Sequence, residues 1–175
     1  MFVHPDWTPV PDFVRYGQVL RSANFLFSAS EALFGTVDPA TERVVRSMID
    51  TMLRVAWDSD TGGFQQAGSS FGRRYEDGSS IFVKTKRWWF QADGMKALLT
   101  MARLHPDAPV DYAAHFVSLW KYVKKYIIDT QHGGWLATGL DSNPSSEKLP
   151  KATVWKDCSH EIEALLDCSV LLDAF

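Results

Sequence analysis

Lys86-Arg87-Trp88-Trp89-Phe90-Gln91-Ala92-Asp93 opens a helical pattern from which the fold prediction for the whole chain starts. Apolar residues recur behind this stretch with the 3.6-residue period of a helix. They are Met95, Leu98, Leu99 and Ala102. The same period places Trp89, Asp93 and Lys96 about one turn apart along one side of the predicted helix.

Three residues of this stretch, Trp89, Gln91 and Asp93, combine an indole ring with an amide and a carboxylate. An aromatic face can cover the C–H groups of a polyhydroxylated ring, while amide and carboxylate groups bind its hydroxyls. The stretch therefore indicates a saccharide site. The alternative is that both tryptophans belong to the core, since aromatic residues at helical spacing are usually packing residues.

Composition is that of a globular protein. The 175 residues suffice for one domain with a real core, so residues 1–175 are expected to form a single domain. Hydrophobic residues make up 46% and charged residues 22%, while seven tryptophans favour a site or interface rich in rings. The net charge of −3 gives no electrostatic case for binding nucleic acid or an anionic membrane.

Cysteine usage and the N-terminus favour a cytoplasmic location. Cys158 directly precedes the helix predicted from about residue 159, and Cys168 lies within it. Ten helical residues span about 15 Å, too far for a disulfide. Free cysteines are typical of a reducing compartment. The N-terminal residues lack a signal-peptide pattern, and no apolar run is long enough to cross a bilayer.

Helical periodicity and end signals divide most of the chain into helices. Asp38-Pro39 is typical of a helix start, with an N-cap followed by proline in the first turn, and Gly35 is a stop signal for the helix before it. Residues 1–11 are expected to be extended, with Trp7 packed on the body of the fold. Five helices are predicted, over about residues 11–34, 39–57, 88–104, 111–127 and 159–172.

A glycine-containing turn occurs twice, about 70 residues apart. In both copies an aspartate is followed by three residues, Gly-Gly, an aromatic residue, three residues and glycine, at 58–68 and 129–139. Residues 79–83 have strand propensity and could pair with 64–66 as a hairpin. Helix pairs alternating with short hairpins predict a helical toroid or solenoid, with a plain helical bundle as the alternative.

In a toroid of paired helices, the inner helices begin at the rim that carries the hairpins. Their first turns would then converge on one cavity. The residues expected around it are Gln18 and Arg21, Trp89 to Asp93, and Trp155 to His160.

The chain resembles the N-acylglucosamine 2-epimerase and cellobiose 2-epimerase family over nearly its whole length. The resemblance rests on motifs that share the family's order and spacing. They are residues 6–12, Tyr16-Gly17, Trp57-Asp58 with Gly62-Gly63-Phe64, residues 86–93, Asp129 with Gly133-Gly134-Trp135, and Trp155-Lys156 with His160. The match corresponds to the C-terminal half of the family's (α/α)6 barrel. It implies an all-α fold, a partial barrel of about five helices with short β-hairpins at the rim.

The resemblance also implies a reaction. Family members interconvert epimers at C2 of a reducing sugar, or isomerise aldoses to ketoses, by removing and returning a proton next to a carbonyl. Two histidines serve as acid and base, because the imidazole pKa is near neutrality. One maps onto His160, but the other maps onto Gln18, and a family glutamate maps onto Arg21. Asp93 replaces another family glutamate.

The predicted activity is accordingly that of a carbohydrate 2-epimerase or isomerase, with catalysis impaired by the change at Gln18, since glutamine cannot exchange a proton near neutral pH. His160 is the expected catalytic residue. The expected substrate-binding residues are Trp89, Gln91, Asp93, Trp155, Gln18 and Arg21. The alternative is a non-catalytic module that binds a saccharide or another protein.

No cofactor and no metal are expected, since the chain shows no convincing metal-ligand spacing and no phosphate-binding glycine loop. The expected ligand is a small saccharide. Five helices cannot close a ring of about twelve, so apolar faces would meet water unless another chain covers them. Association is therefore expected, either as a homo-oligomer or with a chain that supplies the missing half of the barrel; a compact remnant in which the first helix folds over the gap is the alternative.

Overall fold

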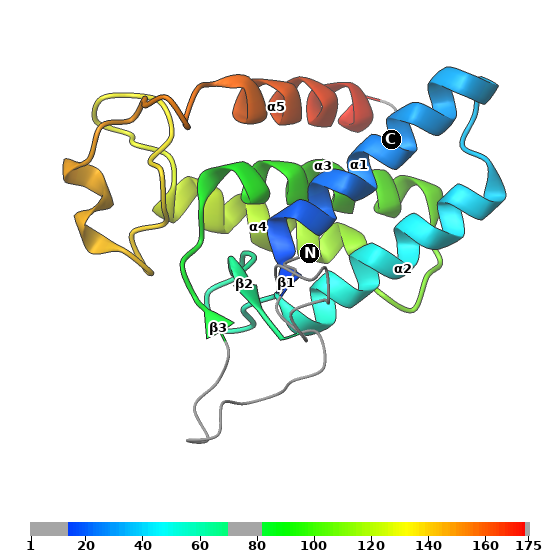
Figure 1. The fold of residues 1–175 in the computed structure, drawn as a ribbon, viewed down its shortest axis with the longest axis horizontal. Coiled ribbons are helices and arrows are strands. Elements are labelled where there is room, and N and C mark those ends of the chain that lie inside the picture. Colours follow the sequence, from blue (N-terminus) through cyan, green and yellow to red (C-terminus); the bar gives the residue numbers. More distant parts are fainter. Residues whose placement is uncertain (1–13, 70–81, 174–175) are drawn as a thin grey trace, which may run out of the picture.

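The structure, a computed structural model, describes residues 14–69 and 82–173 (Figure 1). The expectations for residues 1–11, Trp7 and most of the strand at 79–83 fall outside these residues. The helices are α1 (Tyr16–Phe34), α2 (Pro39–Val55), α3 (Trp88–Leu104), α4 (Tyr112–Tyr126), the 3-10 helix η1 (Pro144–Lys148) and α5 (Ser159–Leu172). The strands are β1 (Val14–Arg15), β2 (Ala67–Gly68) and β3 (Phe82–Val83).

Helix α3 is the centre of the fold. It packs against α1 on one side and α5 on the other, while α4 also packs on α3 and α2 packs on α1 (Figure 1). Because α3 has neighbours on several sides, its apolar residues cover more than one face, and Phe90, Met95 and Leu98 are all buried. The result is an inner row, α1, α3 and α5, with the outer helices α2 and α4 paired to the first two.

Most predicted helix ends are confirmed. The Asp38 side chain accepts hydrogen bonds from the amides of Ala40 and Thr41, with Pro39 in the first turn of α2. Asp111 caps α4 in the same way, and α5 has the predicted bounds. The predicted start of the first helix near residue 11 was wrong, because residues 14–15 pair with β2 as a strand and the helix begins only at Tyr16.

The three strands form a small antiparallel sheet in the order β1-β2-β3. The predicted hairpin is present, but its first strand lies slightly later in the chain than 64–66. Ala67 is opposite Val83 and Gly68 is opposite Phe82, while the Gln66 amide donates to the Val83 carbonyl.

The repeated glycine turns have the same backbone hydrogen bonds. The amide of Asp58 donates to the Gly63 carbonyl, and the amide of Gly62 donates to the Asp58 carbonyl. Asp129, Gly133 and Gly134 repeat both bonds. All four glycines have φ between 75° and 83°, a region that side chains disfavour, so the turn requires glycine at both positions. The repeat inferred from the sequence is thus a structural repeat.

A lysine binds each glycine turn in the same manner, but only one of the two is buried. Lys86 Nζ lies 2.7 Å from Asp58 Oδ2 and donates to the Gly62 carbonyl, and its side chain is 1% exposed. Lys151 Nζ lies 2.5 Å from Asp129 Oδ2 and donates to the Gly133 carbonyl, but its side chain is 31% exposed. Lys86 also pairs with Asp141 at 2.9 Å, which ties the first turn to the loop after Gly139.

We expect Asp58 to make the protein sensitive to acid. Burial alone would raise its pKa, but hydrogen bonds from Lys86 and the Asp60 amide, with the charge of Lys86, hold the pKa of Asp58 at about 2. A carboxyl with a lowered pKa stabilises the fold above its unfolded pKa of about 3.9, and this contribution, about 2 kcal/mol, is lost between about pH 4 and pH 2. Urea unfolding of Asp58→Asn and the unchanged protein across this range should give stabilities that converge as the pH falls. A constant difference would contradict the assignment.

Candidate functional site

Asp93 is the centre of a polar cluster formed by the three inner helices. Its carboxylate is 3% exposed and lies between a guanidinium and an imidazole. Arg21 Nη1 on α1 donates to Oδ1 at 3.0 Å, and His160 Nδ1 on α5 lies 3.5 Å from Oδ2. Asn24, one turn further along α1 than Arg21, donates to the Asp93 carbonyl at 3.0 Å. These contacts bring residues far apart in sequence to one site, as the toroid prediction required.

His160 lies against the two tryptophans that open α3. Its ring centroid is 5.6 Å from Trp89 and 6.5 Å from Trp88, the latter in an edge-on arrangement. Its side chain is 25% exposed, while Nδ1 is buried and lies 3.5 Å from Asp93 Oδ2; neither of these two atoms has a hydrogen-bond partner among the described residues. Because Nδ1 is buried, Nε2 is the ring nitrogen that a ligand can reach.

The charged cluster continues along α3 and α5. Arg21 also binds Glu163 at 3.1 Å, and Lys96 lies 3.7 Å from Glu163 and 2.5 Å from Asp167. Burial acts to lower the pKa of Arg21, but the charges and hydrogen bonds of Asp93 and Glu163 outweigh it, so the pKa is raised. Glu163 and Asp167 were not among the site residues predicted from the sequence. Their spacing from His160, three and seven residues, places them on the same face of α5 and could have indicated them.

The structure gives Gln91 a different role from the predicted one. Gln91 is fully buried, and both ends of its amide bind the backbone of Phe64, whose N–H and C=O each lie 2.8 Å away. It therefore ties α3 to the first glycine turn and has no free polar atom for a ligand. Polar residues buried by tertiary packing commonly find backbone partners in this way.

Trp155 does not join Trp89 and His160, contrary to the prediction. Trp155 is 88% exposed, and its indole ring has no ring contact with another described side chain. The reason is a tight turn in which Thr153 pairs with Lys156, so that Lys156 rather than Trp155 is directed inward. The Lys156 ammonium lies 5.0 Å from the Trp88 ring and 3.2 Å from Glu161.

Gln18 and the glycine before it lie at the same end of α1. Gln18 is exposed, one turn before Arg21, and makes no hydrogen bond to a described residue. Gly17 is needed because a Cβ there would lie 2.6 Å from the Phe90 Cβ and 2.7 Å from Trp89 Cη2. A hollow of about 250 Å³ beside this contact is lined by Arg15, Gly17, Gln66, Arg87 and Trp89.

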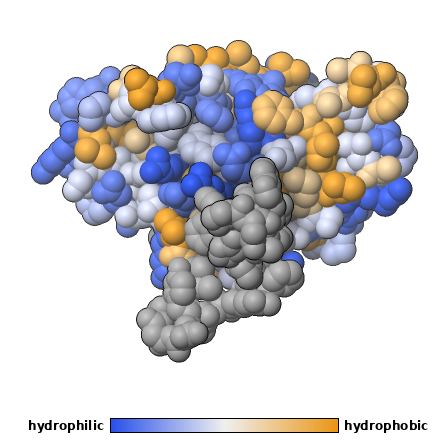
Figure 2. Space-filling model, viewed as in Figure 1, coloured by the Kyte–Doolittle hydropathy of each residue, from blue (hydrophilic) through white to orange (hydrophobic). Residues whose placement is uncertain are grey.

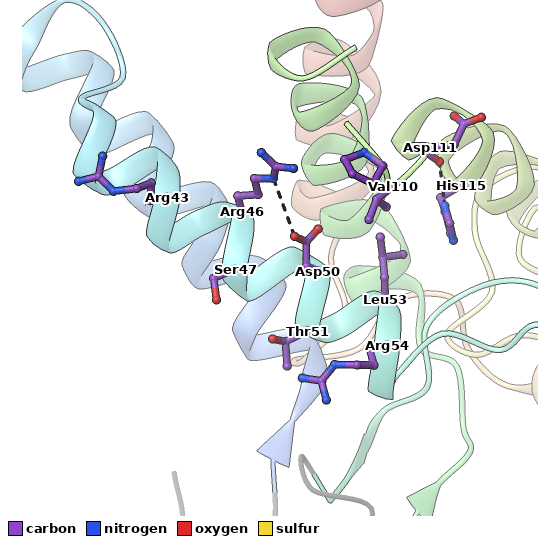
Figure 3. Close-up of a pocket in the computed structure, with 11 residues that line it drawn as sticks. Arg43, Arg46, Ser47, Asp50, Thr51, Leu53, Arg54, Val110, Asp111 and His115 are labelled. Atoms are coloured by element: carbon purple, nitrogen blue, oxygen red, sulfur yellow. Dashed lines mark hydrogen bonds and ion pairs between the residues drawn. The ribbon is translucent and has the colours of Figure 1, made fainter. Parts of the chain in front are cut away.

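A second groove, of about 730 Å³, lies between α2 and the start of α4 (Figure 3). It is lined by Arg43, Arg46, Asp50, Val110, His115 and six further residues, none of them tryptophan. The side chain of Arg43 points away from Val110 and His115, and Arg46 is paired with Asp50 (Figure 3). Most residues that line the groove are polar, but none of them offers an indole face like that of Trp89 beside His160.

Within residues 14–69 and 82–173, no three His, Cys, Asp or Glu residues are placed to hold a metal ion. Cys158 and Cys168 are free thiols, and burial raises the pKa of Cys168 to about 12, which keeps it protonated. Among the described helices, none has the length and apolar character needed to cross a bilayer.

The helix pairs, the glycine turns at one rim and the charged site at the same rim define part of an (α/α)6 barrel. Residues 27–157 match the family model of N-acylglucosamine 2-epimerase (GlcNAc 2-epimerase). Since this match covers well over half of the chain, the protein belongs to the N-acylglucosamine 2-epimerase family.

Individual relatives agree with this assignment. The chain is 21% identical to a cellobiose 2-epimerase of Dictyoglomus turgidum over 157 residues, which is 89% of this chain and 37% of the relative. The structure of cellobiose 2-epimerase from Spirochaeta thermophila matches with a TM-score of 0.74 and 21% identity, over 99% of this chain and 41% of that one. A D-mannose isomerase structure matches with a TM-score of 0.73 and 20% identity, over 93% and 37%. The chain thus spans about two fifths of the length of these relatives.

Proposed function

We propose that this chain forms the catalytic-histidine side of a carbohydrate 2-epimerase-like site, which takes a small reducing sugar in its open-chain form. The observation that carries the proposal is the contact of His160 with both Asp93 and Trp89 at the rim of the inner helices. It provides an acid–base group, a carboxylate and an aromatic face within one site. Family membership and the related epimerases support the sugar as substrate.

The proposed chemistry is proton transfer at C2. Asp93 Oδ2 lies 3.5 Å from Nδ1 of His160 without a hydrogen bond between them. The negative charge of this carboxylate favours the tautomer with the proton on Nδ1, which leaves Nε2 to accept a proton. Removal of the C2 proton from the open-chain aldose moves the electron pair toward the carbonyl oxygen and gives an enediolate. Return of a proton to the other face of C2 yields the epimer. Return of a proton to C1, with transfer of the O2 proton to O1, yields the ketose.

Two departures from the family pattern suggest that this chain is a weak catalyst. Gln18 stands where a second histidine is expected, and its amide cannot take part in proton exchange near neutral pH. Arg21 stands where a glutamate is expected and neutralises Asp93 instead. The alternative function, a saccharide-binding or protein-binding module, is favoured by the same two residues.

We also propose that further helices of the same fold cover the open faces of the inner row. Exposed apolar residues follow a helical stripe on α5 and gather toward the end of α1, as the orange areas over these helices show (Figure 2). They are Ile162, Leu165, Leu166 and Val170, with Phe25, Leu26, Leu33 and Phe34. In addition, α1 and α3 each pack against an outer helix, whereas α5 contacts mainly α3 among the described elements. Large exposed apolar patches commonly mark interfaces.

Proton exchange tests the proposed activity. The protein is incubated in D2O with mannose, N-acetylmannosamine or cellobiose, and deuterium at C2 is followed by NMR. We expect slow exchange with at least one sugar, abolished in His160→Gln and retained in His115→Gln, whose imidazole lies outside the site. No exchange at high protein concentration would leave only the binding functions. Light scattering tests the proposed association, which a monodisperse monomer would contradict.

A further inference from the structure

Arg21 presents hydrogen-bond donors that no residue in the described part of the chain uses. Its Nη1 atom makes both ion pairs, with Asp93 and Glu163. A guanidinium has five N–H donors in a rigid plane, so Nε and Nη2 retain three. These three have no hydrogen bond to any described residue, and neither nitrogen is among the buried unsatisfied atoms. The free edge of the guanidinium is therefore accessible.

The surroundings of Arg21 keep this edge open and fixed in direction. The guanidinium carbon lies over the Phe25 ring, 4.5 Å from its centroid, in a cation–π contact that uses none of the N–H donors as a hydrogen bond to a described residue. The pairs with Asp93 and Glu163 fix the other edge. A guanidinium edge held in this way can donate two parallel hydrogen bonds to two oxygens of a carboxylate or phosphate.

Neighbouring groups extend the same chemistry. Gln18 lies one turn before Arg21 on α1, with an exposed amide that has no partner among the described residues. The hollow beside Trp89 is lined by two further arginines, Arg15 and Arg87. Trp89 therefore contacts the imidazole of His160 and also lines a hollow that includes two arginines.

We propose that the site selects a saccharide with an anionic substituent, a carboxylate or a phosphate, which Arg21 binds through its free edge. This inference rests on the saccharide-binding role proposed above and adds a substrate class to it. A neutral sugar offers the three donors of Arg21 only hydroxyl oxygens, which form weaker hydrogen bonds than a charged group. An anionic sugar would replace that water with charge-assisted hydrogen bonds while its ring lies near Trp89.

Binding of matched sugars tests the proposal. Titration calorimetry or ligand-observed NMR compares D-glucuronate and D-glucose 6-phosphate with D-glucose, on the unchanged protein and on Arg21→Gln. We expect at least one of the anionic sugars to bind about 10- to 100-fold more tightly than glucose, and this preference to be lost in Arg21→Gln. Which of the two binds distinguishes a carboxylate from a phosphate. Arg43→Gln, an exposed arginine on α2, is the matched control and should keep the preference.

Two outcomes would overturn the proposal and are distinguishable from failure of the proposed function. Equal binding of charged and neutral sugars would refute the preference but leave a saccharide site. Binding of no sugar would refute both. A second variant, Glu163→Gln, covers the case in which Arg21→Gln does not fold. It releases Arg21 from one carboxylate, so the anionic sugar should bind several-fold more tightly, and weaker or unchanged binding would contradict the role of Arg21.

Discussion

Replacing Gln18 by histidine is expected to raise the rate of deuterium exchange at C2 of the sugar by about 10²- to 10⁴-fold, the usual contribution of one positioned acid or base. Gln18 is exposed at the first turn of α1, at the rim where His160 lies. A second imidazole there would supply the acid–base group that glutamine cannot. The measurement is the initial exchange rate in D2O by NMR, for Gln18→His and the unchanged protein at equal concentration.

Two controls make this result specific. Gln131→His, on the exposed second glycine turn, adds an imidazole outside the site and should leave the rate unchanged. The double variant Gln18→His with His160→Gln should lose most of the gain, because both groups must act on one sugar. If Gln18→His folds normally and exchanges no faster, the two positions do not share a substrate.

Replacing Arg21 by glutamate, the residue expected from the family pattern, should not raise the exchange rate as Gln18→His does. Arg21→Glu would place a third carboxylate beside Asp93 and Glu163, where the guanidinium now holds both. Like charges at this distance repel and are costly at a partly buried site. The two carboxylates of the cluster therefore require a cation at position 21, so Gln18→His is the substitution expected to raise the rate without disturbing them.

The largest loss of stability is expected for Lys86→Met, about 3–5 kcal/mol, because it removes one partner of a buried ion-pair network. Lys86 contacts Asp58, Asp141 and the Gly62 carbonyl, and lies 4.6 Å from the Tyr122 ring. Without the ammonium, two carboxylates that are mostly withdrawn from water face each other unpaired. Urea unfolding at pH 7 measures the change.

Lys151→Met is the matched control, since Lys151 binds the second glycine turn through the same two kinds of contact. Its side chain is partly exposed and pairs with a single carboxylate, so the loss should be below about 1 kcal/mol. If Lys151→Met lowered the free energy of unfolding as much as Lys86→Met, burial would not determine how much each lysine stabilises the fold.

Local signals in the sequence were sufficient for most of the helices. Asp38-Pro39 sets the start of α2, because the aspartate satisfies free amides and the proline needs none. The Gly-Gly pairs determine two equivalent turns, since glycine adopts these positive φ angles without the steric cost that other residues have. Such preferences depend on neighbours in the chain and can be recognised without knowing the fold. The family resemblance, confirmed over residues 27–157, added how the helices are arranged.

The sequence also predicted part of the site. It indicated that Arg21, Asp93 and His160 would converge, because inner helices of a toroid begin at one rim, and the structure brings them together. It did not distinguish Gln91, which binds Phe64, from a ligand-binding residue, nor did it show that Trp155 lies in a turn that leaves it exposed.

The sequence by itself thus determined the helices, the glycine turns and the family, while the tertiary structure decided which polar side chains remain free. Lys86 and Lys151 show the difference most clearly, since both bind a turn of the same sequence pattern but only Lys86 is buried. The physical reason is that burial and hydrogen-bond satisfaction depend on which elements pack together, and these elements are distant along the chain.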